Sequence, residues 1–159
     1  MTDHGRYEEG VRVRSEVLGA EHVQRSLESA SEFSRPLQEL VTEYCWGAVW
    51  ARGGLARRDR SLINLGMLTA LGRSHELAVH LRGAVANGCT KREIQETLLQ
   101  AAIYCGVPAG MEAFRVVESA IEELARAGIE VPDGDAAAAA SDGGDGDAPE
   151  QPRGGGGEA

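Results

Sequence analysis

The residues best suited to chemistry lie between Arg57 and Gly88. Glu76 and His80 are four residues apart within a predicted helix, so the carboxylate and the imidazole share one face and can touch. Arg58 and Arg60 come earlier, at the start of the preceding predicted helix. A guanidinium can pair with both oxygens of a carboxylate. These four side chains predict an acid–base site for a small carboxylate substrate.

Each of these residues also has a structural explanation. His80 could be a hydrogen-bonded histidine at a helix junction. Arg58 and Arg60 lie about 200° apart on a helix, so at most one points into a given pocket. His75, beside Glu76, suggests half a metal site, but it points about 100° away from Glu76. No second group with ligand spacing follows, so the sequence predicts no metal.

Three further residues have open roles. Glu43 is a second candidate proton carrier, or a surface residue. Trp46, three residues later, either walls an apolar pocket or belongs to the core. Tyr104 offers a hydroxyl donor, or is a buried structural tyrosine. The three cysteines are expected to be packing residues rather than nucleophiles; they are Cys45, Cys89 and Cys105.

The elements that position these residues are six or seven helices, and no segment has the alternation of a strand. Thr90 and Glu93 form the clearest start signal, a capping box. Ser34 and Ser74 are expected to cap two other helices, and Asn87-Gly88 is expected to end one. The predicted ranges are 5–17, 21–29, 34–51, 57–71, 74–87, 90–105 and 108–128.

Composition divides the 159-residue chain into one helical domain, 1–132, and a tail, 133–159. The tail consists almost entirely of Asp, Gly, Ala and Pro, and it holds −6 of the net charge of −9. Without large apolar side chains it cannot offset its ordering entropy, so we expect disorder. The remaining domain is only mildly acidic and has no basic stripe, which argues against nucleic acid as a partner.

Location and assembly follow from the apolar pattern. No stretch approaches the roughly 20 apolar residues of a membrane span, and the N-terminus has no apolar signal region. The odd cysteine count and wide spacings fit a reducing compartment, so a cytoplasmic protein is expected.

Several helices have apolar residues on two sides, which would leave large patches exposed on a monomer. We therefore expect a homo-oligomer.

An ordered set of residues resembles the carboxymuconolactone decarboxylase family, specifically its gamma-carboxymuconolactone decarboxylase branch, over roughly residues 5 to 128. The set reads Glu43, Trp46-Gly47, Leu55, Arg58-Asp59-Arg60-Ser61-Leu62, Ala70-Leu71-Gly72-Arg73, Glu76-Leu77, His80, Gly83-Ala84, Asn87-Gly88, Thr90, Glu93-Ile94 and Tyr104-Cys105-Gly106-Val107-Pro108.

This resemblance implies an alkylhydroperoxidase D-like helical fold, a trimer or hexamer, and cofactor-free decarboxylation of 4-carboxymuconolactone, a dicarboxylate lactone of protocatechuate breakdown. It implies catalytic roles for His80, Glu76 and Glu43, and substrate binding by Arg58, Arg60 and Trp46. In the related peroxidases a cysteine pair precedes the histidine; here Glu76 stands where the second cysteine would be. A thiol peroxidase is therefore disfavoured. A non-catalytic binding module of the same fold stays open.

Overall fold

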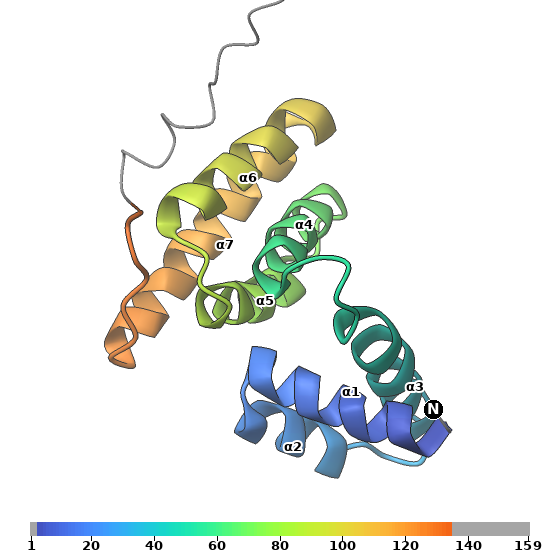
Figure 1. Cartoon of the computed structure of the whole chain (residues 1–159). Coiled ribbons are helices and arrows are strands. Elements are labelled where there is room, and N and C mark those ends of the chain that lie inside the picture. Colours follow the sequence, from blue (N-terminus) through green and yellow to red (C-terminus); the bar gives the residue numbers. More distant parts are fainter. Residues whose placement is uncertain (1–2, 135–159) are drawn as a thin grey trace, which may run out of the picture.

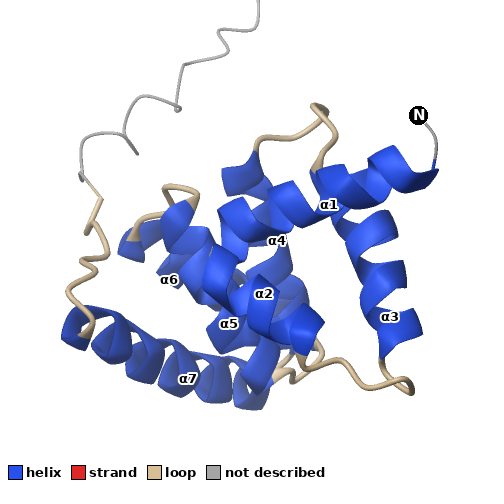
Figure 2. Ribbon diagram, turned by 90° about the horizontal axis from the view of Figure 1, so that it is seen from below, coloured by secondary structure: helices blue, strands red, loops and turns tan. Residues whose placement is uncertain are grey.

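The computed structural model describes residues 3–134, and this part of the chain contains helices and no strand (Figure 2). The helices are α1 (Asp3–Leu18), α2 (Ala20–Glu28), α3 (Arg35–Leu40), α4 (Arg57–Ala70), α5 (Ser74–Ala86), α6 (Lys91–Cys105) and α7 (Val107–Arg126), with a π-helical segment, η1 (Val41–Trp50), directly after α3. The all-helical prediction is confirmed. The predicted helix 34–51 is confirmed as a helical segment, but its second half is π-helical.

The helices form two regions that lie side by side in Figure 1. The N-terminal region, residues 3–50, contains α1, α2, α3 and η1; the C-terminal region, residues 57–134, contains α4 to α7. The C-terminal region has an aliphatic core, in which Leu65 and Leu81 are fully buried. The N-terminal region has a smaller core of two valines and two tryptophans, namely Val13, Val17, Trp46 and Trp50.

Glycines set the close crossing of α1 and η1. A Cβ on Gly10 would lie 2.0 Å from the backbone oxygen of Thr42, and one on Gly47 would lie 2.2 Å from that of Arg6. These distances are far shorter than a van der Waals contact, so only glycine permits the two backbones to approach this closely. The crossing fixes the position of η1, and therefore of the side chains that η1 carries.

The predicted helix boundaries agree in part with the caps observed. The Thr90 capping box is present, with the Thr90 hydroxyl accepting from the backbone N–H of Glu93. Gly88 follows α5 in the left-handed region, with φ of 86°, as expected. The predicted serine caps are correct only in part: Ser34 is the N-cap residue of α3, though its side chain makes no capping hydrogen bond, whereas Ser74 is not an N-cap residue. Ser74 is already helical, and its hydroxyl donates to Glu112 on α7 instead.

The segment after α7 returns to the start of α6. Val131 is buried, and the backbone oxygen of Pro132 accepts from Lys91 N–H at 2.8 Å. Asp133, the first residue of the predicted tail, forms an ion pair with the Lys91 ammonium at 2.8 Å. The rest of that tail, 135–159, lies outside the described residues.

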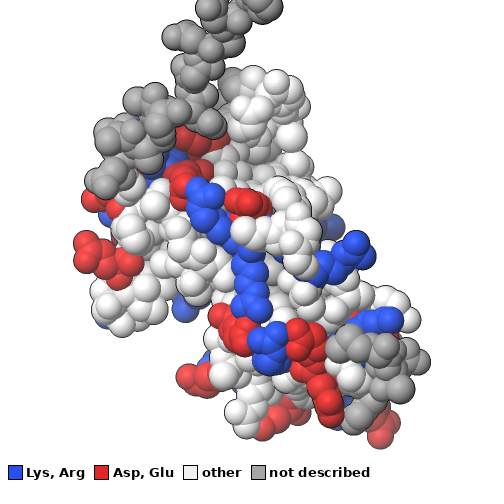
Figure 3. Space-filling model, viewed as in Figure 1, with Lys and Arg blue, Asp and Glu red and all other residues white. Residues whose placement is uncertain are grey.

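Charged side chains of both signs lie over the face of the molecule seen in Figure 3. The upper part of that face shows mostly uncharged residues. None of the helices described between residues 3 and 134 has both the length and the apolar character of a membrane span.

Candidate active site

His80 lies on the face of α5 that meets η1, at the boundary between the two regions. Its imidazole lies nearly parallel to the indole of Trp46, at 5° and with 6.3 Å between ring centroids. The indole of Trp50 lies 6.5 Å from the imidazole, and the two indoles are 4.9 Å apart. The structure therefore brings together His80 and Trp46, two of the residues predicted for the site, and adds Trp50.

The π-helical turn explains how both indoles reach the same place. The backbone N–H of Ala51 donates to the oxygen of Trp46, five residues earlier, at 3.0 Å. Thr42, Trp46 and Trp50 are buried, and their spacing of four places them on one face of η1. The core explanation for Trp46 is confirmed, because it belongs to the small N-terminal core, and its indole also faces His80. The same four-residue spacing could have drawn attention to Trp50.

Asn64 supplies the polar contact of His80. Its amide Nδ2, on α4, lies 3.3 Å from Nδ1 of the imidazole. Within residues 3–134 this is the only hydrogen bond found for the ring. The sequence analysis did not identify Asn64, and a lone asparagine in a helix offers no signal that could have found it.

Two opposing influences act on the pKa of His80. The Glu76 carboxylate raises the pKa of His80, as expected for an opposite charge one turn away. Burial lowers that pKa by more, so the net shift is downward from 6.5. The imidazole is therefore neutral at neutral pH. Glu76 acts on it through its charge, while the hydrogen bond comes from Asn64.

The two predicted arginines point to opposite sides of α4, as their spacing requires. Arg58 forms ion pairs with Glu93 on α6 and with Asp59, so its guanidinium is occupied inside the C-terminal region. Arg60 turns toward the segment after η1 and donates to the backbone oxygen of Arg52 at 3.2 Å. Its Nε is buried, with no hydrogen-bond partner among the described residues. Arg60 shares a face of α4 with Asn64, which follows four residues later.

Glu43 is paired with a residue of α1. It forms an ion pair with Arg6, with 3.5 Å between the two charged groups, across the crossing of η1 and α1. Its Oε1 is buried and has no hydrogen bond among the described residues. Tyr104 is 78% exposed, so the interpretation as a buried structural tyrosine is wrong.

The three cysteines differ in burial. Cys89 is a packing residue, as predicted, whereas Cys45 and Cys105 are exposed, so the packing prediction is wrong for these two. Desolvation of the sulfur raises the pKa of the Cys89 thiol, and it also raises the pKa of the Cys45 thiol although that residue as a whole is exposed, which disfavours the reactive thiolate at both positions. Across residues 3–134, no three His, Cys, Asp or Glu side chains cluster in a way that could hold a metal ion.

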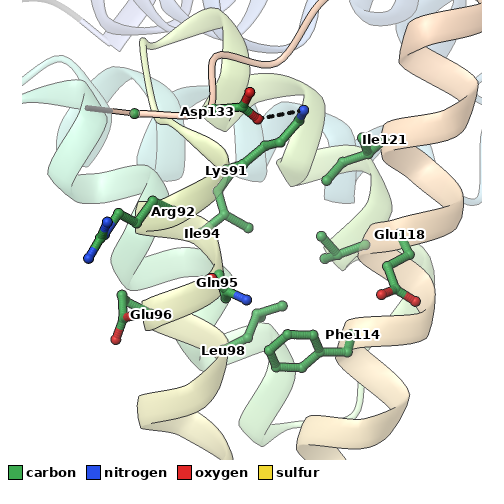
Figure 4. Close-up of a pocket in the computed structure, with 12 residues that line it drawn as sticks. Lys91, Arg92, Ile94, Gln95, Glu96, Leu98, Phe114, Glu118, Ile121 and Asp133 are labelled. Atoms are coloured by element: carbon green, nitrogen blue, oxygen red, sulfur yellow. Dashed lines mark hydrogen bonds and ion pairs between the residues drawn. The ribbon is translucent and has the colours of Figure 1, made fainter. Parts of the chain in front are cut away.

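Several cavities open away from His80. One of about 600 Å³ lies between α6 and α7, with Ile94, Leu98 and Phe114 at its apolar floor (Figure 4). Charged groups surround it, including the Lys91–Asp133 pair and Glu118 (Figure 4). None of the residues predicted for the acid–base site lines this cavity. This cavity is therefore separate from the His80 cluster, which consists of His80, Trp46, Trp50 and Asn64.

Comparison with known proteins places the chain in a family of enzymes. The carboxymuconolactone decarboxylase family matches residues 35–119. A nitrosuccinic acid decarboxylase of Metarhizium robertsii is 47% identical over 118 residues, which cover 74% of this chain and 82% of that protein. A 4-carboxymuconolactone decarboxylase of Acinetobacter baylyi is 44% identical over 124 residues, covering 78% of this chain and 92% of that protein.

The helical fold, the His80 cluster and these relatives define the class of the protein: it is a carboxy-lyase. The chain belongs to the carboxymuconolactone decarboxylase family. Since the protein is an enzyme, the alternative of a non-catalytic binding module is set aside. The relatives act on different acids, so the substrate has to be argued from chemistry.

Proposed function

We propose that the protein is a 4-carboxymuconolactone decarboxylase, which forms beta-ketoadipate enol-lactone and carbon dioxide in protocatechuate catabolism, in the cytoplasm. The observation that carries the proposal is the 44% identity to the Acinetobacter enzyme over 92% of its length. The His80 cluster supports it, because it combines a neutral imidazole with two indoles. Arg60 lies one turn before Asn64 on α4 and has a buried Nε with no partner in the described part of the chain.

The substrate supplies its own electron sink. The departing carboxylate sits on a ring carbon that is conjugated, through the ring double bond, with the lactone carbonyl. When the bond to the carboxylate breaks, its electron pair flows into that carbonyl and forms an oxyfuran-like dienolate. A proton then adds to the ring carbon next to the lactone carbonyl, and the double bond that remains at the former carboxylate carbon makes the product the enol-lactone. The enzyme has to position two carboxylates, keep water from the scissile one, and stabilise the new oxyanion.

Each requirement has a candidate group in this chain. Arg60 binds a substrate carboxylate, because its guanidinium faces the η1 side while Arg58 is held by Glu93. The indoles of Trp46 and Trp50 provide the dry wall. Neutral His80 donates a hydrogen bond to the developing oxyanion, which is a suitable role for an imidazole whose pKa is lowered by burial. Glu76 is exposed and carries from solvent the proton that is delivered to the ring carbon next to the lactone carbonyl.

A second substrate has a specific observation in its favour, the 47% identity to a nitrosuccinic acid decarboxylase. Both acids contain a succinate unit with an electron sink on the carbon that bears one carboxylate. The sink is the unsaturated lactone in carboxymuconolactone and the nitro group in nitrosuccinate. The Arg60 guanidinium, the two indoles and the His80 donor could act in either reaction. The two substrates differ in the shape and polarity of the group that accepts the electron pair.

The test is a direct comparison of the two substrates with chelator-treated protein, following carbon dioxide release and the ultraviolet spectrum. We expect turnover of 4-carboxymuconolactone with kcat/KM at least tenfold above that for nitrosuccinate. The reverse ranking would assign the protein to nitrosuccinate. A rate that depends on added divalent metal would contradict the cofactor-free mechanism.

We also propose that the protein assembles with copies of itself, as a trimer or hexamer, through its exposed apolar residues. An apolar groove of about 660 Å³ lies between α4 and α6, where Met67 is 50% exposed and Tyr104 is 78% exposed. A second patch on α3 and η1 includes Phe33, which is 96% exposed, and Leu37. Patches of this kind usually mark protein interfaces.

Light scattering coupled to size exclusion would test the assembly. Tyr104→Glu places a charge in the α4–α6 groove and should reduce the particle to a smaller species. The control is Glu118→Gln, in the cavity between α6 and α7, which should leave the mass unchanged. A wild-type monomer would contradict the proposal.

A further inference from the structure

The contact between Asn64 and His80 bears on the chemical state of the imidazole. A neutral imidazole has one N–H and one lone pair, so it exists as two tautomers that expose different groups to a substrate. Asn64 approaches Nδ1 with its Nδ2, a group that can only donate, at 3.3 Å. A donor at this position requires a lone pair on Nδ1, and the proton of the ring must then be on Nε2.

We propose that Asn64 is a positioning residue that holds His80 in the Nε2–H tautomer and keeps the ring neutral. The inference rests on the proposed function for its catalytic meaning. Protonating Nδ1 would set an N–H against the amide N–H of Asn64, so the contact opposes formation of the imidazolium. This opposition adds to that of burial, and both act against the charge of Glu76.

The two ring nitrogens of His80 have different surroundings. Nδ1 is occupied by α4, while Nε2 lies on the other edge of the ring and has no hydrogen-bond partner among residues 3–134. Nε2–H is therefore the donor available to the substrate oxyanion. The indoles of Trp46 and Trp50 lie 4.9 Å apart and both pack on the same side of the ring, which restricts its rotation.

Glu76 could not perform this function. A carboxylate in contact with the ring accepts from an N–H and stabilises the imidazolium, whereas an amide nitrogen does neither. The pairing of a buried histidine with an asparagine therefore favours a neutral hydrogen-bond donor over a cationic acid. It also explains why Asn64 lies on the same face of α4 as Arg60, since both then serve one bound substrate.

The decisive variant is Asn64→Asp, which has nearly the same shape but presents only acceptors. The carboxylate should draw the proton to Nδ1 and raise the pKa of His80. The matched control is Asn87→Asp, because the Asn87 amide also donates to a neighbouring side chain, Ser61 at 2.9 Å, but does not touch His80. Asn64→Leu removes the donor without adding a charge.

The first readout is ¹⁵N nuclear magnetic resonance of the histidine rings without substrate. The chain has four histidines, and His80→Gln assigns the signal of interest. We expect the Nε2–H tautomer in the wild-type protein and in Asn87→Asp, and the Nδ1–H tautomer with a higher pKa in Asn64→Asp. A wild-type ring protonated on Nδ1, or an unchanged His80 pKa in Asn64→Asp, would overturn the proposal.

The second readout is turnover. Asn64→Asp should lower kcat on the order of 10²-fold, within the range of a misplaced acid–base group, and change KM little. Its residual activity should follow the raised His80 pKa, which a purely structural defect would not produce. Unchanged kcat would overturn the catalytic part. If the wild-type protein decarboxylates neither acid, the proposed function fails, whereas the spectra still decide the tautomer.

Discussion

The two regions of the molecule are built on different principles. The C-terminal region buries aliphatic side chains, such as Leu81, Ile94 and Leu98, in a core shared by four helices. The N-terminal region instead buries two indoles and a guanidinium. Arg14 is 7% exposed, donates to the neutral groups of Gln38 and Thr42, and has its pKa lowered by burial.

The two cores should therefore respond differently to substitution. An aliphatic core gains stability from apolar area and tolerates modest changes in shape. The N-terminal region depends on specific contacts, including backbone crossings that only glycine allows at Gly10 and Gly47. His80 extends from the C-terminal region and packs against the indoles of the N-terminal region. Small displacements of η1 should therefore lower activity before they lower stability.

The largest effect is expected at His80, the link between the regions. His80→Ala should reduce turnover by about 10² to 10⁴-fold, the usual range for an acid–base or donor group. Helicity by circular dichroism should be retained. The control is His75→Ala, a change of an exposed histidine on another face of α5. Near-normal turnover of His80→Ala would remove His80 from the mechanism and make Glu43 the next candidate.

The next largest effect on kcat/KM is expected at Arg60 and not at Arg58, the other arginine at the start of α4. Arg60→Ala should lower kcat/KM by about 2–4 kcal/mol in transition-state stabilisation, the scale of an unpaired carboxylate. Arg58→Ala should change kcat/KM little and cost at most about 1 kcal/mol of stability, because its partners Glu93 and Asp59 are partly exposed. If steady-state kinetics shows equal small effects, the carboxylate is bound by another group, such as Arg73.

The crossing of α1 and η1 provides a smaller effect with a sharp control. Gly47→Ala forces a Cβ to within 2.2 Å of a backbone oxygen and should cost about 1–3 kcal/mol of unfolding free energy. Activity should fall further than this loss explains, because Trp46 moves away from His80. Gly66→Ala on α4 would meet only a Thr97 methyl at 3.7 Å, so denaturant melts should show a neutral or stabilising change.

The pH dependence tests which charge state of His80 is active. Burial lowers the pKa of His80, so the neutral form prevails at pH 7 and above. We expect kcat/KM to be level there and to fall about tenfold per pH unit below that pKa, as the imidazolium replaces the donor tautomer. A rate that increases as the pH falls would show instead that the imidazolium is the active acid.

The smallest effect is expected from the tail. Deleting residues 135–159 leaves the Asp133–Lys91 pair in place and removes no apolar side chain larger than alanine. Activity, melting temperature and particle mass should be unchanged within error, because such a segment adds almost nothing through burial. Dissociation or inactivation of the shortened protein would show that the tail is part of the assembly.

Much of the fold could be predicted from the sequence, for local reasons. Apolar periodicity and glycine stops gave six helices whose ends agree with the structure to within two residues. The Thr90–Glu93 capping box was identified correctly because both of its partners lie within one turn. Ser34 was placed correctly at the start of α3, whereas the Ser74 cap was wrong, since the Ser74 hydroxyl donates to Glu112 on a distant helix.

What the sequence determined by itself is therefore the set of helices and the face that carries Glu76 and His80, because both depend on neighbours within four residues. The tertiary structure decided the rest. It turned Arg60 toward η1 and Arg58 toward Glu93, brought Trp50 and Asn64 to the imidazole, and let burial outweigh the charge of Glu76. These outcomes depend on desolvation and on contacts between helices, which no local pattern encodes.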